Sequence, residues 1–130
     1  MIVLDASAAI DWLIQSSEGR LIEQRISSRK ETLHAPHLLD IEVAQVLRRM
    51  VSQRLISHQR ADTAVQDLRD LRIVRYPHFL LLPRMWQLRH NLSAYDAAYV
   101  ALAEELSAPL VTRDGRVAAA SGHTAVIEVF

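Results

Sequence analysis

With 130 residues, half of them apolar, the chain is long enough for one hydrophobic core and too short for two ordinary domains, so we expect a single domain spanning residues 1–130. No cysteine is present, which excludes disulfide bonds and thiolate metal sites and leaves oxygen and nitrogen as the ligands for any metal ion. Fifteen basic residues balance fifteen acidic ones, so no overall charge attracts the chain to nucleic acid.

The apolar N-terminal segment predicts a strand, a tight turn and a helix. Residues 2–4 form the strand, and Ser7 is placed to cap a helix over residues 8–13. The acids Asp5 and Asp11 interrupt the segment, which a secretory or membrane-spanning stretch would not tolerate. We therefore expect a soluble, cytoplasmic protein without a membrane partner.

Strands and helices alternate along the rest of the chain. Apolar runs bounded by proline or polar residues predict strands, and apolar residues recurring every three or four positions predict helices. In chain order we expect a helix at 18–28, a strand at 33–35, helices at 37–53 and 57–70, a strand at 73–74, helices at 83–90 and 94–106, a strand at 110–112, a helix at 115–120 and a strand at 125–129. Because parallel neighbours need crossovers, this order predicts an α/β fold, a central and mostly parallel sheet of four to five strands with helices on both faces.

Two acids follow strands of this sheet. Asp5 ends the first strand, and Asp114 lies two residues beyond Thr112 at the end of a buried strand. The carboxyl ends of parallel strands share one edge of the sheet, where open α/β folds bind ligands. Taken singly, each aspartate is more often a helix cap or a turn residue than a ligand.

Asp96 begins a helix that is apolar nearly all round. Its spacing from Ser93 fits a capping box, which is a purely structural explanation. The helix that follows, residues 97–103, is too apolar for a solvated edge, so its first turn should lie in the interior. A buried carboxylate needs partners, and we therefore include Asp96 in the candidate site.

Glu42 lies beside the buried face of the third helix, between Leu38 and Val46 on the helical wheel. The structural alternative is a surface glutamate at the margin of that face, or one paired with Arg49. Asp40 points away from this face at helical spacing, and we leave it out of the site.

Four converging carboxylates would repel one another unless cations offset their charge. Hard divalent ions such as Mg²⁺ or Mn²⁺ prefer oxygen ligands and are typically held by a few carboxylates together with substrate phosphate. Such a site suits phosphodiester cleavage, because the ion acidifies a water and stabilises the leaving oxygen. The residues therefore predict metal-assisted hydrolysis, with Asp5, Glu42, Asp96 and Asp114 as the ligand and catalytic set.

Other chemistries fit the sequence less well. A Mg²⁺-binding phosphoacceptor signalling domain also gathers acids at strand ends, but it uses a lysine from a late strand, and Lys30 is the only lysine here. A small-molecule phosphatase would place a second aspartate two residues after the first, where this chain has Ser7. A binding module without activity would not be expected to keep all four acids.

Arginines near the acids are candidate phosphate contacts. Arg48, Arg49 and Arg54 lie on or just after the third helix, and Arg113 and Arg116 flank Asp114. For the first three, a solvated helix face is the structural alternative. The tryptophans Trp12 and Trp86 could stack on bases, although their apolar helical spacing is more typical of a core or a dimer interface.

Four sequence blocks together resemble a known family. They are Asp5-Ala6-Ser7 after the first strand, the helix start from Pro36 to Glu42-Val43-Ala44, the block Leu92 to Ala103 that contains Ser-Ala-Tyr-Asp, and Leu110-Val-Thr-Arg-Asp114. In order and spacing these blocks are similar to the PIN-domain ribonucleases, specifically the VapC-type toxins of prokaryotic toxin–antitoxin pairs.

The resemblance implies a three-layer α/β/α PIN-like domain that cuts RNA with Mg²⁺ or Mn²⁺. It places the family's acidic quartet at Asp5, Glu42, Asp96 and Asp114, and gives the hydroxyls of Ser7 and Thr112 a supporting role. It further implies a homodimer and a cognate VapB-type antitoxin whose tail enters the active-site groove. A PIN-domain nuclease of RNA processing, without a toxin role, remains the alternative within the family.

Overall fold

The fold is built on a five-stranded sheet in which every neighbouring pair of strands is parallel. It was analysed in a computed structural model that describes all residues from 1 to 130. The strand order is β3-β2-β1-β4-β5, with bounds β1 Ile2–Leu4, β2 Leu33–Pro36, β3 Ile73–Tyr76, β4 Leu110–Thr112 and β5 Ile127–Val129. The first strand in sequence therefore lies at the centre of the sheet, and the chain grows outward from it in both directions.

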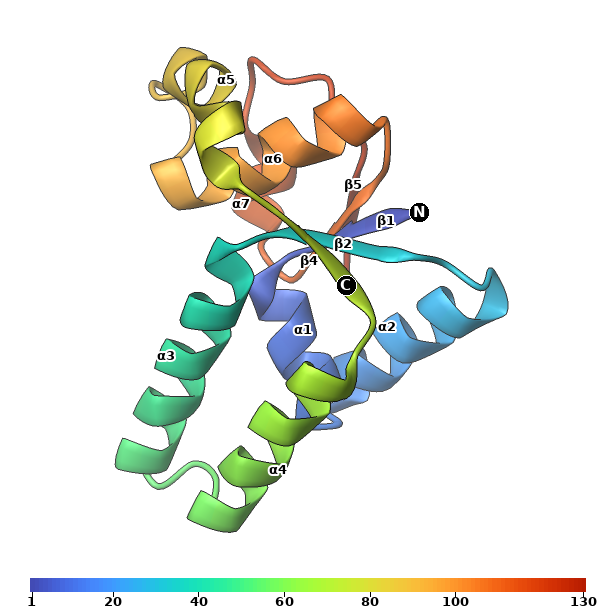
Figure 1. Ribbon diagram of the computed structural model, residues 1–130, viewed down its shortest axis with the longest axis vertical. Helices are drawn as coiled ribbons and strands as arrows, with labels where there is room; N and C mark the ends of the chain where they lie inside the picture. Colours follow the sequence, from blue (N-terminus) through green and yellow to red (C-terminus); the bar gives the residue numbers. More distant parts are fainter.

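Helices cover both faces of the sheet and give three layers (Figure 1). One layer contains α1 Ala6–Leu13, α2 Ser17–Ser28, α3 Leu38–Ser52 and α4 His58–Asp70, and the other contains the 3₁₀ helix η1 His78–Leu81, α5 Leu82–Gln87, α6 Ala94–Leu106 and α7 Gly115–Ala119. The expected α/β/α architecture is confirmed. None of these helices combines the length and apolar character that crossing a membrane requires.

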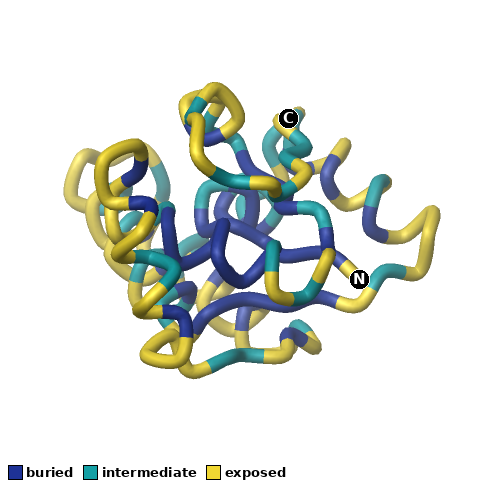
Figure 2. The backbone as a smooth tube through the Cα atoms, turned by 90° about the horizontal axis from the view of Figure 1, so that it is seen from above, coloured by how far each residue is buried: buried dark blue, intermediate teal, exposed yellow.

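The core lies between the central strands and α6. All three residues of β1 are fully buried, and seven consecutive residues of α6, Ala97–Ala103, are at most 2% exposed. Figure 2 shows this buried centre surrounded by helices that expose their outer faces. A strand buried on both faces reads as a continuous apolar run, which is the pattern of residues 2–4.

Several boundaries differ from the sequence expectations. The first helix begins at Ala6, so Ser7 lies inside its first turn and does not cap it, because the Ser7 hydroxyl binds the Asp5 carboxylate instead. The helix expected at 83–90 is α5, which begins at Leu82 and already ends at Gln87, and the 3₁₀ helix η1 precedes it. The last strand is confined to residues 127–129.

Candidate active site

The four predicted acids line one cavity of about 350 Å³ at the carboxyl edge of the sheet. Asp5 follows β1, Glu42 belongs to α3, Asp96 lies in the first turn of α6, and Asp114 follows β4. No lysine, arginine or histidine is among the residues that line the cavity. Asp11 of α1 also lines the cavity, so the four predicted acids and a fifth share one space with no basic residue among those that line it.

Asp5 is held in place by two hydroxyl groups. Its Oδ2 atom accepts hydrogen bonds from Ser7 Oγ at 2.7 Å and from Thr112 Oγ1 at 2.6 Å. The same two hydroxyls accept backbone N–H groups, Ser7 from Arg113 and Thr112 from Asp114, each at 3.0 Å. Because the hydroxyls join β1, α1 and the end of β4, they fix the carboxylate relative to both strand ends.

Glu42 is oriented by a buried tyrosine of α6, a helix on the other face of the sheet. The hydroxyl of Tyr99, a residue 1% exposed, donates to Glu42 Oε1 at 2.7 Å. Burial raises the pKa of the Glu42 carboxyl, and the charges of Asp5 and Asp96 raise it further. Sequence reasoning missed Tyr99, although its position three residues after Asp96 on one helix face was a usable signal.

Asp96 lies in the first turn of α6, which Ser93 caps as the spacing predicted, and it also lines the cavity. The Ser93 hydroxyl accepts the backbone N–H of Asp96 at 3.2 Å, which caps α6. Burial raises the pKa of the Asp96 carboxyl, and the charges of Asp5 and Asp114 act in the same direction. The capping bond uses the backbone of Asp96, and its carboxylate, which the Ser93 hydroxyl also contacts, lines the cavity.

Among the four predicted acids, Asp114 is the one that forms an ion pair with a base. Its carboxylate accepts the backbone N–H of Arg116 at 2.9 Å and a guanidinium N–H of the same residue at 2.7 Å. Hydrogen bonding to Arg116 lowers the pKa of Asp114. The Arg116 side chain is 90% exposed, so this pair lies at the mouth of the cavity.

The donor set fits a hard divalent cation. All four side chains offer oxygen, and burial, together with neighbouring carboxylates, raises the pKa of Glu42 and Asp96, so a bound cation would favour their charged forms. As the side chains stand, no three acidic or histidine groups converge closely enough to enclose an ion on their own. Mg²⁺ usually keeps several water ligands and takes only a few carboxylates, which suits this open arrangement.

The arginines proposed to contact RNA are placed differently from one another. Arg48 and Arg49 are exposed on α3 and take part in no ion pair within the chain. The Arg113 guanidinium, in contrast, donates to Asp11 Oδ2 at 2.6 Å and to the backbone carbonyl of Phe130. Arg113 therefore ties α1 to the C-terminal residue, because two internal acceptors already occupy the group that a phosphate would need.

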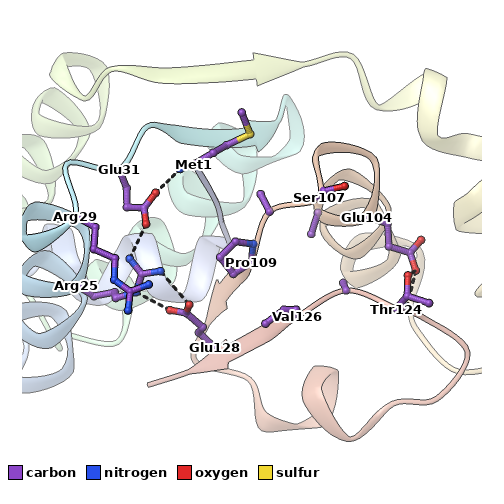
Figure 3. Close-up of a pocket in the computed structure, with 13 residues that line it drawn as sticks. Met1, Arg25, Arg29, Glu31, Glu104, Ser107, Pro109, Thr124, Val126 and Glu128 are labelled. Carbon is purple, nitrogen blue, oxygen red and sulfur yellow. Dashed lines mark hydrogen bonds and ion pairs between the residues drawn. The ribbon is translucent and has the colours of Figure 1, made fainter.

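A second cavity, of about 480 Å³, lies at the amino edge of the sheet (Figure 3). Most of its charged groups are paired within the protein: Arg25 donates to Glu31 and to Glu128, the amino group of Met1 binds Glu31, and Glu104 binds Arg84. Each acid that lines this cavity thus has a basic partner, which distinguishes it from the cavity that holds the four predicted acids.

Comparisons with known proteins agree with this geometry. The sequence pattern of the PIN domain matches residues 2–122. The chain is 42% identical to Ribonuclease VapC12 of Mycobacterium tuberculosis over 129 residues, which is 99% of this chain and 98% of that protein.

Two solved structures show the same fold at low sequence identity. PAE2754 from Pyrobaculum aerophilum superimposes with a TM-score of 0.72 and 22% identity over 98% of this chain and 83% of its own. VapBC2 from Rickettsia felis, solved bound to a DNA fragment from its promoter, contains a chain that superimposes with a TM-score of 0.70 and 12% identity over 99% of this chain and 98% of its own.

Proposed function

Because the chain belongs to the PIN-domain family, and within it to the VapC ribonucleases, we propose that it is a metal-dependent endoribonuclease and the toxin of a type II toxin–antitoxin pair. The observation that carries the proposal is the single cavity lined by Asp5, Glu42, Asp96 and Asp114 with no base among them. A divalent ion held there, Mg²⁺ or Mn²⁺, supplies the positive charge and Lewis acidity that phosphodiester hydrolysis needs.

The chain's own residues would hold the ion and position the reacting groups. We assign Asp5, Asp96 and Asp114 as direct ligands. Asp5 needs no rearrangement, since Ser7 and Thr112 already fix it. Glu42, held by Tyr99, would orient the attacking water for in-line approach to phosphorus, with the bond to the 3′ oxygen breaking. The raised pKa of Glu42 makes it a better acceptor for the proton of that water than an ordinary glutamate.

Exposed arginines would contact the RNA outside the cavity. Arg48 and Arg49 lie on α3, the helix that also carries Glu42, and Arg116 lies at the cavity mouth. Phosphate contacts of this kind position a strand without reading its sequence. In this proposal Arg113 is a structural residue and makes no phosphate contact.

The cavity also has an apolar side that suits a protein inhibitor. Ile10 of α1, Ile14 just after it, and Val46 and Met50 of α3 line the same cavity as the acids. A segment with apolar side chains and one basic residue would satisfy both halves of this groove. We propose that the tail of a VapB-type antitoxin binds here, that the protein pairs with a second copy of itself, and that it works in the cytoplasm.

Cleavage of total RNA tests the proposed chemistry. Purified protein should cut RNA with Mg²⁺, lose activity in EDTA, and lose about 100-fold or more as Asp96→Asn, because the variant removes a charged ligand. Asp62→Asn is a matched control, since Asp62 is exposed on α4 and lines no part of the cavity. Undiminished cleavage in EDTA or by Asp96→Asn would refute the mechanism.

A further inference from the structure

Arg116 bonds to both oxygen atoms of the Asp114 carboxylate. Its Nε atom donates to Oδ1 at 3.0 Å and to Oδ2 at 3.2 Å, and its Nη2 atom donates to Oδ2 at 2.7 Å. A planar guanidinium and a carboxylate match each other in such a two-point arrangement. The backbone N–H of Arg116 adds a bond to Oδ1 at 2.9 Å, so one residue contacts each oxygen of this acid.

The other predicted acids are bound less completely by the protein. Asp5 accepts its two hydroxyl bonds at Oδ2 alone, and Glu42 accepts the Tyr99 bond at Oε1 alone. In both side chains the second oxygen has no protein donor at hydrogen-bond distance. Asp114 is therefore the acid for which a bound cation would compete most directly with a protein group.

The charge of Arg116 also acts on Asp96. Burial is the main cause that raises the pKa of the Asp96 carboxyl, and the charges of Asp5 and Asp114 raise it further. Arg116 is the one charged group that acts on this carboxyl in the opposite direction. The guanidinium thus offsets part of the repulsion between acids of the candidate site, as a bound cation would. Because two positive groups in one place repel each other, the guanidinium and a divalent ion are competitors.

The Arg116 side chain can leave Asp114 without disturbing the fold. It is 90% exposed, and its hydrogen bonds all go to Asp114. A Cβ added at Gly115 would meet no atom within 4 Å, so the space beside the pair is open as well. The bond that caps α7 uses the Arg116 backbone, so it would keep the Asp114 carboxylate in place after the guanidinium has moved.

We propose that Arg116 is a displaceable counter-ion of the candidate active site. Without a metal ion, its guanidinium holds the Asp114 carboxylate and reduces the repulsion among the acids. When Asp114 takes a divalent ion, the guanidinium leaves and becomes available to a phosphate of the bound RNA, which its planar donor edge suits equally well. The inference rests on the proposed function for the ion and the RNA, and adds an order: the ion binds first, and Arg116 contacts the RNA second.

Binding of Mn²⁺ in the absence of RNA tests the first half of the proposal. Electron paramagnetic resonance measures the free ion, so the readout does not depend on cleavage. Arg116→Met removes the charge and the donors but keeps an unbranched side chain, and it should lower the Mn²⁺ dissociation constant about three- to tenfold at low salt. Arg116→Lys keeps the charge and should stay closer to wild type.

Arg69→Met is the matched control for the loss of a surface arginine. Arg69 is exposed on α4, forms no ion pair and lines no part of the acidic cavity. This variant should leave the Mn²⁺ dissociation constant unchanged. Far-UV circular dichroism checks that each variant is folded.

Binding of a labelled single-stranded RNA oligonucleotide tests the second half, on a Glu42→Gln background that suppresses cleavage. With Mn²⁺ present, Arg116→Met should weaken RNA binding about three- to tenfold, because the released guanidinium would be lost as a phosphate contact. In EDTA the same substitution should weaken it by less than about twofold, because Asp114 retains the guanidinium of the parent protein.

The outcomes separate this proposal from the proposed function. An unchanged or weaker Mn²⁺ affinity of folded Arg116→Met would overturn the displaceable counter-ion and leave the nuclease proposal standing. Equal weakening of RNA binding in Mn²⁺ and in EDTA would also overturn it, since Arg116 would then be a phosphate contact that no ion releases. A wild-type protein that binds no Mn²⁺ would refute both proposals together.

Discussion

Replacing Thr112 with valine tests whether the hydroxyl network holds the acidic cavity together. Thr112 is completely buried, and its hydroxyl donates to the Asp5 carboxylate at 2.6 Å while accepting the N–H of Asp114 at 3.0 Å. Valine has nearly the same shape, so the substitution removes both hydrogen bonds without opening a cavity. Ser7 would then be the remaining side-chain donor to Asp5.

The size of the effect follows from these two bonds. A hydrogen bond to a charged group contributes about 1.5 to 3 kcal/mol, and an N–H group that loses its partner costs about 1 kcal/mol more. We therefore expect Thr112→Val to lower the free energy of unfolding by about 2 to 4 kcal/mol. Against a typical total of about 5 to 15 kcal/mol, this is a large fraction of the stability of the domain.

Urea denaturation followed by circular dichroism measures this loss, with the midpoint falling and the slope unchanged. Thr112→Ser keeps the hydroxyl and should cost only about 1 kcal/mol for the lost methyl group. Thr63→Val on the exposed face of α4 should change stability by less than about 0.5 kcal/mol. If Thr112→Val costs no more than Thr112→Ser, the hydroxyl does not support Asp5 in the way described.

Three further predictions concern packing, an ion pair and the cavity charge. Gly19→Ala should lower the unfolding free energy by about 3 kcal/mol in a thermal melt, because a Cβ at this position would overlap the backbone of α1. Gly115→Ala is the control, since a Cβ there meets open space and should leave the unfolding free energy nearly unchanged. Arg84 lowers the pKa of Glu104 to about 2, so Glu104→Gln should cost about 1 kcal/mol at pH 7, and the difference from wild type should shrink as pH falls from 4.5 towards 2. Asp96→Asn should melt at a higher temperature than wild type in EDTA at pH 7, because the raised pKa of Asp96 means that its charged form destabilises the fold. Added Mg²⁺ should raise the melting temperature of wild type more than that of the variant.

The sequence predicted the parts of the fold that depend on local pattern. The helix from 94 to 106 and the strand from 110 to 112 agree with the structure to the residue, because a serine cap and a buried apolar run mark their limits. The boundaries of the helices between β3 and α6 were less well marked in the sequence. A leucine run at 80–82 is compatible with more than one helical start, and the structure resolves it as a 3₁₀ turn followed by a short helix.

In the candidate site, too, local sequence pattern predicted some features and not others. The sequence located the four acids because strand ends and helix starts have regular places in a parallel sheet. It did not predict the side-chain contacts around them: Tyr99, expected only as part of the apolar stretch 97–103, binds Glu42, and Arg113, predicted as a possible phosphate contact, binds Asp11 in the structure. Such pairings depend on how α3 and α6, from opposite faces of the sheet, approach one another at its carboxyl edge and on how the C-terminus returns to α1, which no local pattern encodes.

The central position of β1 also determines when the acidic cavity can exist during synthesis. Asp5 is made first, but its neighbour β4 and the last acid, Asp114, lie more than one hundred residues later in the chain. A partly synthesised chain therefore lacks part of the acidic cavity however well its first helices are formed. Under the proposed function, we expect no RNA cleavage by the nascent chain until almost all of the fold has been translated.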